Sequence, residues 1–530
     1  MEKRSRFDLP RGNVPWQGGA CAGGWRQKGR KAECVDQGDL LVTKPPSPPG
    51  KGREAWGRVG VTAPIVAKKW RNGHGAKGAQ EGGDVTDEPL QAPPDGVLGK
   101  QATPAGEMQA RWAWVEAEVW TERMLTALEQ GVKGGKWYSL MDKICAPPTL
   151  RKAFARVKAN QGAAGVDHVT VAEFEHHLAA NLEKLARGLR EGSYRPQAIR
   201  RHWIRKWGSQ EKRPLGIPTV RDRVVQTALR AVLEPIFERD FAAHSYGFRP
   251  NRGCKDALRR VDTLLQAGYN WGVDADLKSY FDTIPHAALI NRVKEKVADG
   301  RVLELLKAFL TQKVMETAEG WRPEEGTPQG AVVSPLLSNI YLDPLDQQMA
   351  KQGYEMIRYA DDFVILCRGE AEAGAALAEV QAWTASAGLT LHPTKTRIVD
   401  AREPGGFDFL GYHFAAGTRW PRAKSLGKFK DTIRGKTRRT HGQSLSATIT
   451  GVNRTLRGWF EYFQHRRRFA FEVLDAWVRM RLRSILRYRQ GRRGRGRGTD
   501  HHRWPNAFFA EQGLLSLVAA HDSVCPSSRR

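Results

Sequence analysis

Two adjacent carboxylates are the most distinctive chemical feature of the sequence. Asp361 and Asp362 stand between apolar arms in IRYADDFVILC (357–367), a pattern that predicts a β-hairpin with a polar tip. Neighbouring carboxylates repel each other, so a half-buried pair calls for a compensating positive charge such as a bound cation. A solvated turn is the alternative, because aspartates are common in turns.

A third carboxylate occurs upstream in the segment VDADLKSYFD. Val273, Ala275 and Leu277 alternate there with Asp274 and Asp276, which predicts a strand with one apolar face and one acidic face. Three hard oxygen donors suit Mg²⁺, which binds few carboxylates and keeps positions for phosphate oxygens and water. Two such ions, about 3.5–4 Å apart, stabilise the attacking and leaving oxygens of an in-line phosphoryl displacement.

The composition favours a polyanionic partner. The 530 residues include 85 Lys+Arg and 57 Asp+Glu, which gives a formal net charge of +28. An excess of this size predicts nucleic acid first and an anionic membrane second. No apolar run reaches the ~18 residues of a membrane span, so no membrane partner is expected. The six cysteines lie far apart without a CxxC pair, which excludes a disulfide scaffold and a zinc ribbon and favours a reducing cytosol.

The chain divides into five segments by composition and pattern. Its length allows about three or four domains at ~150 residues each. The first hundred residues hold 18 of the 54 Gly and 10 of the 28 Pro, which is typical of low-complexity sequence. We predict a disordered extension (1–105), a helical region (106–195), a mixed strand-and-helix domain (196–418), a basic helical domain (419–490) and an Arg/Gly-rich C-terminal segment (491–530).

Strand and helix patterns interleave without the regular alternation of a doubly wound fold. Short strands are expected at RPLGIP, at VDADL, on both arms of the hairpin and at GGFDFLGYHF. This order favours an α+β fold with an antiparallel sheet. Apolar residues recur at helical spacing over 112–128, 149–160, 171–190, 286–312 and 371–387.

Positive charge is concentrated in one block near the C-terminus. Residues 419–498 contain 23 Lys+Arg and 4 Asp+Glu, a net charge of +19. The apolar residues of the block keep helical spacing, which predicts helices with one buried face and one basic face. Arg479, Arg483 and Arg487 fall mostly outside the apolar stripe and are the expected RNA-binding residues, and the run GRRGRGRG suits phosphate contact.

An ordered set of motifs resembles the group II intron-encoded reverse transcriptase/maturase family. The resemblance runs from about 120 to about 520. It implies a right-hand polymerase, with fingers and palm over 196–418 and an α-helical thumb or maturase domain over 419–490. The motifs are, in order, WTERMLTALEQGVKGGKWYSLMDK (120–143), ANQGAAGVDHVT (159–170), RPLGIPTVRDRVVQ (213–226), HSYGFRPNRGCKDAL (244–258), DADLKSYFD (274–282), GTPQGAVVSPLLSNIYL (326–342), YADDFVIL (359–366), GLTLHPTKT (388–396), FLGY (409–412) and GQSL…LRGWFEYF (442–463).

The resemblance implies an RNA-directed DNA polymerase that binds its group II intron RNA and promotes splicing and mobility. The implied substrates are an RNA template, a DNA primer or target, and dNTPs. Asp276, Asp361 and Asp362 would bind two Mg²⁺ ions, with Mn²⁺ as a substitute. The carbonyl of Leu277 would add an oxygen ligand.

Further matched positions would contact the incoming nucleotide. Phe281 would pack under the sugar and leave no room for a 2′-hydroxyl. Gln329 would line the nucleotide and template pocket, beside Gly330, which lets the backbone approach closely. The other expected contacts are basic: Lys212, Arg213 and Arg221 as a clamp on the triphosphate, and Lys395 as a general acid near the leaving pyrophosphate.

One departure and two alternatives bear on this interpretation. Nothing after the thumb resembles the zinc-bearing endonuclease of many members, and 504–521 resembles the terminal segment of members that lack it. The expected location is the cytoplasm of a bacterial cell, which leaves nucleoid association open. The alternatives are a splicing maturase with a lapsed polymerase, and a related reverse transcriptase serving defence or diversity generation. The intact carboxylates argue against a lapsed polymerase, and the maturase-like thumb argues against a role in defence or diversity generation.

Overall fold

The computed structural model describes residues 110–316, 320–464 and 468–524, all within one compact unit, Gly96–Arg530. The predicted disordered extension (1–105) lies outside the described residues. No helix in the described part of the chain is long and apolar enough to cross a membrane.

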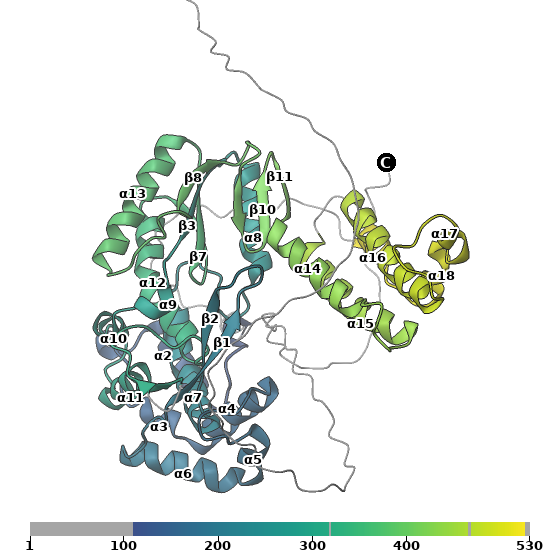
Figure 1. The fold of residues 1–530 in the computed structure, drawn as a ribbon. Helices are drawn as coiled ribbons and strands as arrows, with labels where there is room; N and C mark the ends of the chain where they lie inside the picture. The colour runs from purple at the N-terminus through teal and green to yellow at the C-terminus, as the bar shows by residue number, and fades with distance from the viewer. Residues whose placement is uncertain (1–109, 317–319, 465–467, 525–530) are drawn as a thin grey trace, which may run out of the picture. The chain divides into compact units, whose positions relative to one another are not determined.

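A four-stranded antiparallel sheet forms the palm (Figure 1). Its strand order is β6 (Glu355–Tyr359), β7 (Asp362–Cys367), β3 (Trp271–Asp276) and β8 (Arg397–Asp400). Helix α13 (Glu370–Ser386) packs on β3 and β7. The antiparallel pairing confirms the predicted α+β fold. Helices α12 (Ser334–Lys351), α8 (Cys254–Gln266) and the short α9 (Tyr280–Thr283) also belong to this region.

A second sheet forms the fingers. Strands β1 (Ile199–Arg205) and β2 (Lys212–Ile217) make an antiparallel hairpin, and β1 pairs in parallel with β4 (Val314–Met315). Strand β5 (Gly320–Trp321) completes the order β2-β1-β4-β5. The long helix α7 (Val220–Glu238) follows β2 and is buried along most of its length.

Two predicted helical stretches of the N-terminal region differ in the structure. The stretch over 171–190 is divided at His177 into two helices, and the stretch over 112–128 is not one helix. No single helix spans 112–128; α2 (Glu122–Gln130) begins only after a stretch of turns. Trp112 and Trp120 are nevertheless buried, and the indole of Trp120 donates to the carbonyl of Ala231 at 3.1 Å. The apolar spacing therefore arose from packing against α7 and not from a helical stripe. The other helices here are α3 (Met141–Ile144), α4 (Pro147–Asn160), α5 (Val171–His176) and α6 (Leu178–Glu191), after the 3₁₀ turn η1 (Lys133–Gly135).

The predicted helix over 286–312 is also divided, into α10 (His286–Lys294) and α11 (Gly300–Leu310). Asp299 causes the division, because its carboxylate accepts hydrogen bonds from the N–H groups of Arg301 and Val302. This side chain caps a new helix, as aspartate commonly does.

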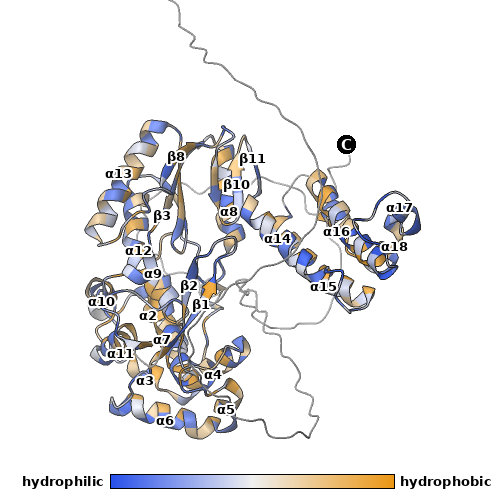
Figure 2. Cartoon of the chain, in the orientation of Figure 1, coloured by the Kyte–Doolittle hydropathy of each residue, from blue (hydrophilic) through white to orange (hydrophobic). Residues whose placement is uncertain are grey.

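The C-terminal region is a small sheet followed by helices. Strands β9 (Phe407–Phe409), β10 (Tyr412–Ala415) and β11 (Thr418–Pro421) form the sheet. Figure 2 shows apolar and polar residues interleaved along α15 (Leu445–Phe463) and α16 (Arg468–Arg489), as expected for helices with one buried face. The remaining helices are α14 (Ala423–Lys436), α17 (Thr499–Arg503), α18 (Asn506–Glu511) and α19 (Leu517–Val524).

Candidate active site

The paired aspartates lie at the tip of the predicted hairpin. Tyr359 on β6 pairs with Asp362 on β7, so Ala360 and Asp361 form a two-residue turn. Asp362 also lies directly opposite Asp276 in the pairing of β7 with β3. The fold thus brings the three predicted catalytic carboxylates to one end of the palm sheet.

Burial and like charge act on both hairpin carboxylates. Burial, followed by the neighbouring charges of Asp361 and Asp274, raises the pKa of Asp362 to about 7. Burial also raises the pKa of Asp361, where the positive charge of Arg213 opposes the shift and Asp276 adds to it. A carboxylate whose ionised form is disfavoured in this way gains stability from a cation.

The two carboxylates of β3, Asp274 and Asp276, each pair with a basic residue. Asp276 is paired with Lys395, whose Nζ lies 2.5 Å from its carboxylate oxygen. Asp274 forms an ion pair with Arg397 at 3.4 Å and acts on Asp362. Within the described ranges, no group of three His, Cys, Asp or Glu side chains is already arranged to hold a metal ion.

The carbonyl of Leu277 points toward the hairpin. The carbonyl of Asp276 accepts from His392 at 2.7 Å, and the N–H of Lys278 donates to Thr390 at 2.8 Å. Alternate residues of a strand direct their backbone groups to opposite sides. The N–H and carbonyl of Leu277 therefore face the β7 side. Because Asp276 pairs with Asp362, the next residue along, Asp361, lies opposite Leu277.

The backbone turns sharply before Phe281. Strand β3 ends at Asp276, and Ser279 adopts a left-handed conformation with φ 51°. Phe281 on α9 is half-buried, whereas Tyr280 is buried and donates its hydroxyl to the carbonyl of Ser338 at 2.8 Å. Of the two rings, only that of Phe281 is available to a ligand.

The TPQG loop joins the fingers to the palm. The N–H of Gly216 on β2 donates to the carbonyl of Gln329 at 2.6 Å, and the N–H of Thr327 donates to Phe281 at 2.6 Å. At Gly330, with φ 108°, an added Cβ would lie 2.5 Å from the carbonyl oxygen of Gly216. Glycine is therefore required for this close approach.

The three basic residues predicted for the triphosphate differ in exposure. Lys212 and Arg213 are exposed on β2, and Arg213 acts electrostatically on Asp361. Arg221 is half-buried, with its guanidinium 5.0 Å from the ring centre of Tyr194 and a 3.3 Å hydrogen bond to the carbonyl of Arg195. The side chain of Arg221 thus packs between the fingers and the N-terminal helices.

The raised pKa of Asp362 predicts a pH-dependent stability. A carboxyl whose pKa is higher in the folded chain binds more protons when folded, so its contribution is lost as pH rises through about 7. In the presence of a chelator, the Tm should decrease as the pH rises from the ordinary pKa range of an aspartate to about 7. Asp362→Asn should flatten this part of the profile, as thermal unfolding at several pH values would show. Parallel profiles for the two proteins would contradict the assignment.

Comparison with known proteins identifies the chain. Residues 204–414 match the family described as reverse transcriptase (RNA-dependent DNA polymerase), and residues 426–504 match the group II intron maturase-specific domain. Protein YkfC of Escherichia coli (strain K12) is 34% identical over 314 residues, which cover 52% of this chain and 82% of that protein. The chain belongs to the group II intron-encoded reverse transcriptase family.

Other relatives match shorter parts of this reverse transcriptase. The group II intron-encoded protein LtrA of Lactococcus lactis is 38% identical over 203 residues, which span 38% of this chain and a third (33%) of LtrA. Nuclear intron maturase 2 of Arabidopsis thaliana is 30% identical over 252 residues, 40% of this chain and 33% of that protein. Among solved structures, a partial Cas6-RT-Cas1–Cas2 complex has a TM-score of 0.31 at 24% identity, covering 46% of this chain and 42% of that one.

The three arginines expected to bind RNA lie on α16 and are partly or fully buried. Arg483 is only 3% exposed, and its guanidinium donates to the carbonyl of Trp504 at 2.9 Å and to Asn506 at 2.8 Å. Arg487 is half-buried and pairs with Asp500 at 2.6 Å, and Arg479 is half-buried as well. The segment after α16 thus covers Arg483 and pairs with Arg487, and RNA binding by these arginines stays a prediction.

Exposed cations of the reverse transcriptase's thumb lie on other helix faces. Arg454 and Arg457, one turn apart, are exposed on α15. Lys424 and Lys428, also one turn apart, are exposed on α14. The helical period alone did not distinguish them from Arg483, because the covering segment is remote in sequence.

Charge reversal at Arg454 and Arg457 should weaken RNA binding and flatten its dependence on salt. Each lost phosphate contact removes about 0.7–0.9 from the log–log slope. The slope can be measured by RNA titrations at several salt concentrations. Arg187→Glu with Arg259→Glu is the matched control, since it changes the total charge equally at two exposed arginines outside the thumb. Equal slopes in the two double variants would show that α15 does not contact RNA.

Proposed function

We propose that the protein is an RNA-directed DNA polymerase that uses two divalent metal ions and acts on its group II intron RNA. The observation that carries the proposal is the meeting of Asp276, Asp361 and Asp362 at the end of β3 and β7. Intron RNA as template, a DNA primer or target, and dNTPs are the proposed substrates.

The donor set of this site suits Mg²⁺. Asp276 and Asp361 offer hard carboxylate oxygens, and the carbonyl of Leu277 is directed to the same side. Asp276 already attracts a positive group, the ammonium of Lys395. When bound, a pair of Mg²⁺ ions supplies charge stabilisation for the attacking and leaving oxygens. Mn²⁺, which accepts similar oxygen ligands, is the proposed substitute.

Neighbouring side chains would position the reactants. Phe281 would lie beneath the sugar, and Gln329 would line the pocket between fingers and palm. Arg213 would attract the triphosphate, and its electrostatic effect on Asp361 supports this role. Lys395, which pairs with Asp276, would donate a proton to the departing pyrophosphate once that ion pair is released.

Primer extension on an RNA template tests the proposal. The full chain should extend an annealed DNA primer with dNTPs and Mg²⁺, and chelation should stop the extension. Binding of intron RNA without any extension would instead support a maturase that lacks polymerase activity. Extension on RNA together with failure to bind intron RNA would favour a reverse transcriptase in another role.

A further inference from the structure

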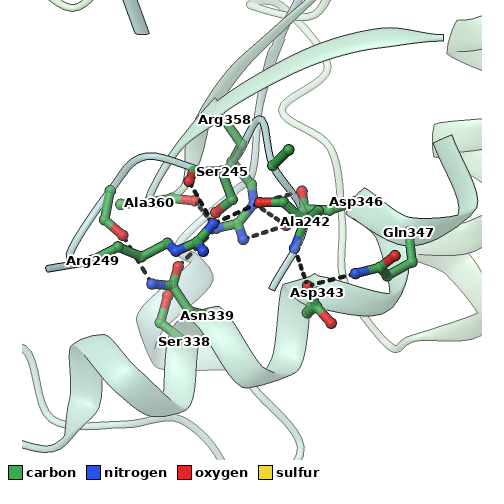
Figure 3. Close-up of polar contacts among 12 residues, drawn as sticks. Ala242, Ser245, Arg249, Ser338, Asn339, Asp343, Asp346, Gln347, Arg358 and Ala360 are labelled. Carbon is green, nitrogen blue, oxygen red and sulfur yellow. Dashed lines mark hydrogen bonds and ion pairs between the residues drawn. The ribbon is translucent and has the colours of Figure 1, made fainter. Parts of the chain in front are cut away.

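A buried arginine lies directly beneath the catalytic turn. Arg358 on β6 is 1% exposed, and its Nε and Nη2 donate to Asp346 of α12 at 2.5–3.0 Å (Figure 3). Its Nη1 donates to the side-chain oxygen of Asn339 at 3.0 Å and to the carbonyl of Ala360 at 2.9 Å. One guanidinium therefore connects α12 to the residue that precedes Asp361.

Ala360 has an unfavourable backbone conformation. Its φ is 62°, while Asp361 does not have a positive φ. A two-residue hairpin loop with positive φ at the first position alone is the pattern of a type II′ turn, in which glycine is strongly preferred there. A non-glycine residue persists in such a conformation only when the surrounding structure over-determines it.

A second contact is made with the same residue by the loop that carries Gly247. At Gly247, an added Cβ would lie 2.2 Å from the backbone nitrogen of Ala360, so the loop passes against the turn. Asn339 donates to the carbonyl of Gly247 at 2.8 Å while it accepts from Arg358. The turn is thus in contact with both a glycine loop and a guanidinium, and Asn339 bonds to both of them.

We propose that Arg358 is a positioning residue for catalysis, which holds the strained Ala360 turn so that the carboxylate of Asp361 stays beside Asp276. The inference rests on the proposed polymerase function for the importance of that geometry. The aspartate and asparagine of α12 orient the guanidinium, and the guanidinium orients the turn. Arg358 itself touches no substrate and no metal ion.

Arginine is required for this task because of its planar fork of donors. The guanidinium donates hydrogen bonds to both carboxylate oxygens of Asp346, and its Nη1 still donates to Asn339 and to the carbonyl of Ala360. A lysine would keep the buried positive charge but would present one compact ammonium group. Arg358→Lys therefore keeps the positive charge that pairs with Asp346 but loses the hydrogen bond to the carbonyl of Ala360.

The matched control is Arg419→Lys. The side chain of Arg419 on β11 is 14% exposed and pairs with Asp262 of α8 at 2.5 Å. It is also a mostly buried arginine paired with an aspartate, but within the described residues neither side chain bonds to the hairpin turn. Both substitutions should lower the Tm, so stability alone does not distinguish them.

Hydrogen exchange of the hairpin peptide in the metal-free protein is the first readout. Exchange at 359–363 should become at least about ten-fold faster in Arg358→Lys and stay unchanged in Arg419→Lys. In steady-state assays, kcat should fall about 10- to 100-fold in Arg358→Lys with KM for dNTP unchanged, as for a small displacement of a catalytic group. Equal exchange and equal kcat in the two variants would overturn the proposal.

Two further variants keep the test decisive. Asn339→Ala leaves the ion pair of Arg358 in place and should produce the same direction of change, even if Arg358→Lys does not fold. Ala360→Gly relieves the conformation that Arg358 must hold, so the loss of kcat caused by Arg358→Lys should be smaller in the Ala360→Gly background. A loss that is identical in both backgrounds would contradict the proposal. Absence of extension by the unmodified protein would reject the polymerase function, and the exchange result would still test the hold on the turn.

Discussion

Replacing Asp361 by asparagine is expected to abolish cDNA synthesis while RNA binding is retained. Asparagine has the same shape as aspartate but lacks the charge that binds a divalent cation. Metal ions supply several kcal/mol of transition-state stabilisation, so the loss should be about 10³-fold or more. Asp276→Asn should have the same effect, because Asp276 lies opposite Asp362, the neighbour of Asp361, and its charge acts on Asp361.

The measurement is single-turnover primer extension on an RNA template, with RNA affinity measured in parallel. RNA affinity depends on the basic surface and should be unchanged. Asp400→Asn is the control: it removes a carboxylate from the same sheet, at the end of β8, where Asp400 pairs with Arg402. An Asp361→Asn protein that extends primers as fast as this control would reject the metal site.

Replacing Phe281 by alanine should raise ribonucleotide incorporation about ten-fold or more relative to deoxynucleotides. The ring is half-buried on α9, just after the turn at Ser279. Beneath the sugar, it would reject ribose by a clash with the 2′-hydroxyl. Rejection by shape in a tight pocket can exceed the ~1–3 kcal/mol of a single methylene.

The ratio of kcat/KM for a matched dNTP and rNTP on one primed RNA template measures this selectivity. Phe281→Tyr keeps the ring and should keep the selectivity. An unchanged ratio in Phe281→Ala would place the ring away from the sugar. Tyr280, the neighbouring aromatic residue, offers no alternative, because its ring is buried and its hydroxyl is bonded to Ser338.

The sequence by itself determined the local elements that carry the chemistry. The alternation of Val273, Ala275 and Leu277 with Asp274 and Asp276 predicted strand β3 with its apolar side inward, and all three apolar residues are buried. The apolar arms around Asp361 and Asp362 predicted the hairpin β6–β7. These patterns depend on residues within a few positions of each other, so they can be interpreted without knowledge of the rest of the chain.

Periodicity failed where remote segments decided the environment. The apolar spacing over 112–128 predicted a helix, yet residues such as Trp120 are buried because α7 lies against an irregular stretch. Arg483 was expected on a basic face, yet Trp504 and Asn506 cover it and bond to it. In both cases the period described local spacing correctly, but another part of the chain determined what was buried.

The tertiary structure alone decided which side chains meet. Asp276 lies opposite Asp362 through strand pairing, and Lys395 reaches Asp276 from a third segment. The buried Arg358 stood in the sequence as a single charge between apolar residues, a signal without an identifiable partner. Asp346, twelve positions earlier on α12, became that partner only when the helix packed against β6. Contacts of this kind depend on how separate elements are packed together, and that arrangement is a property of the whole fold.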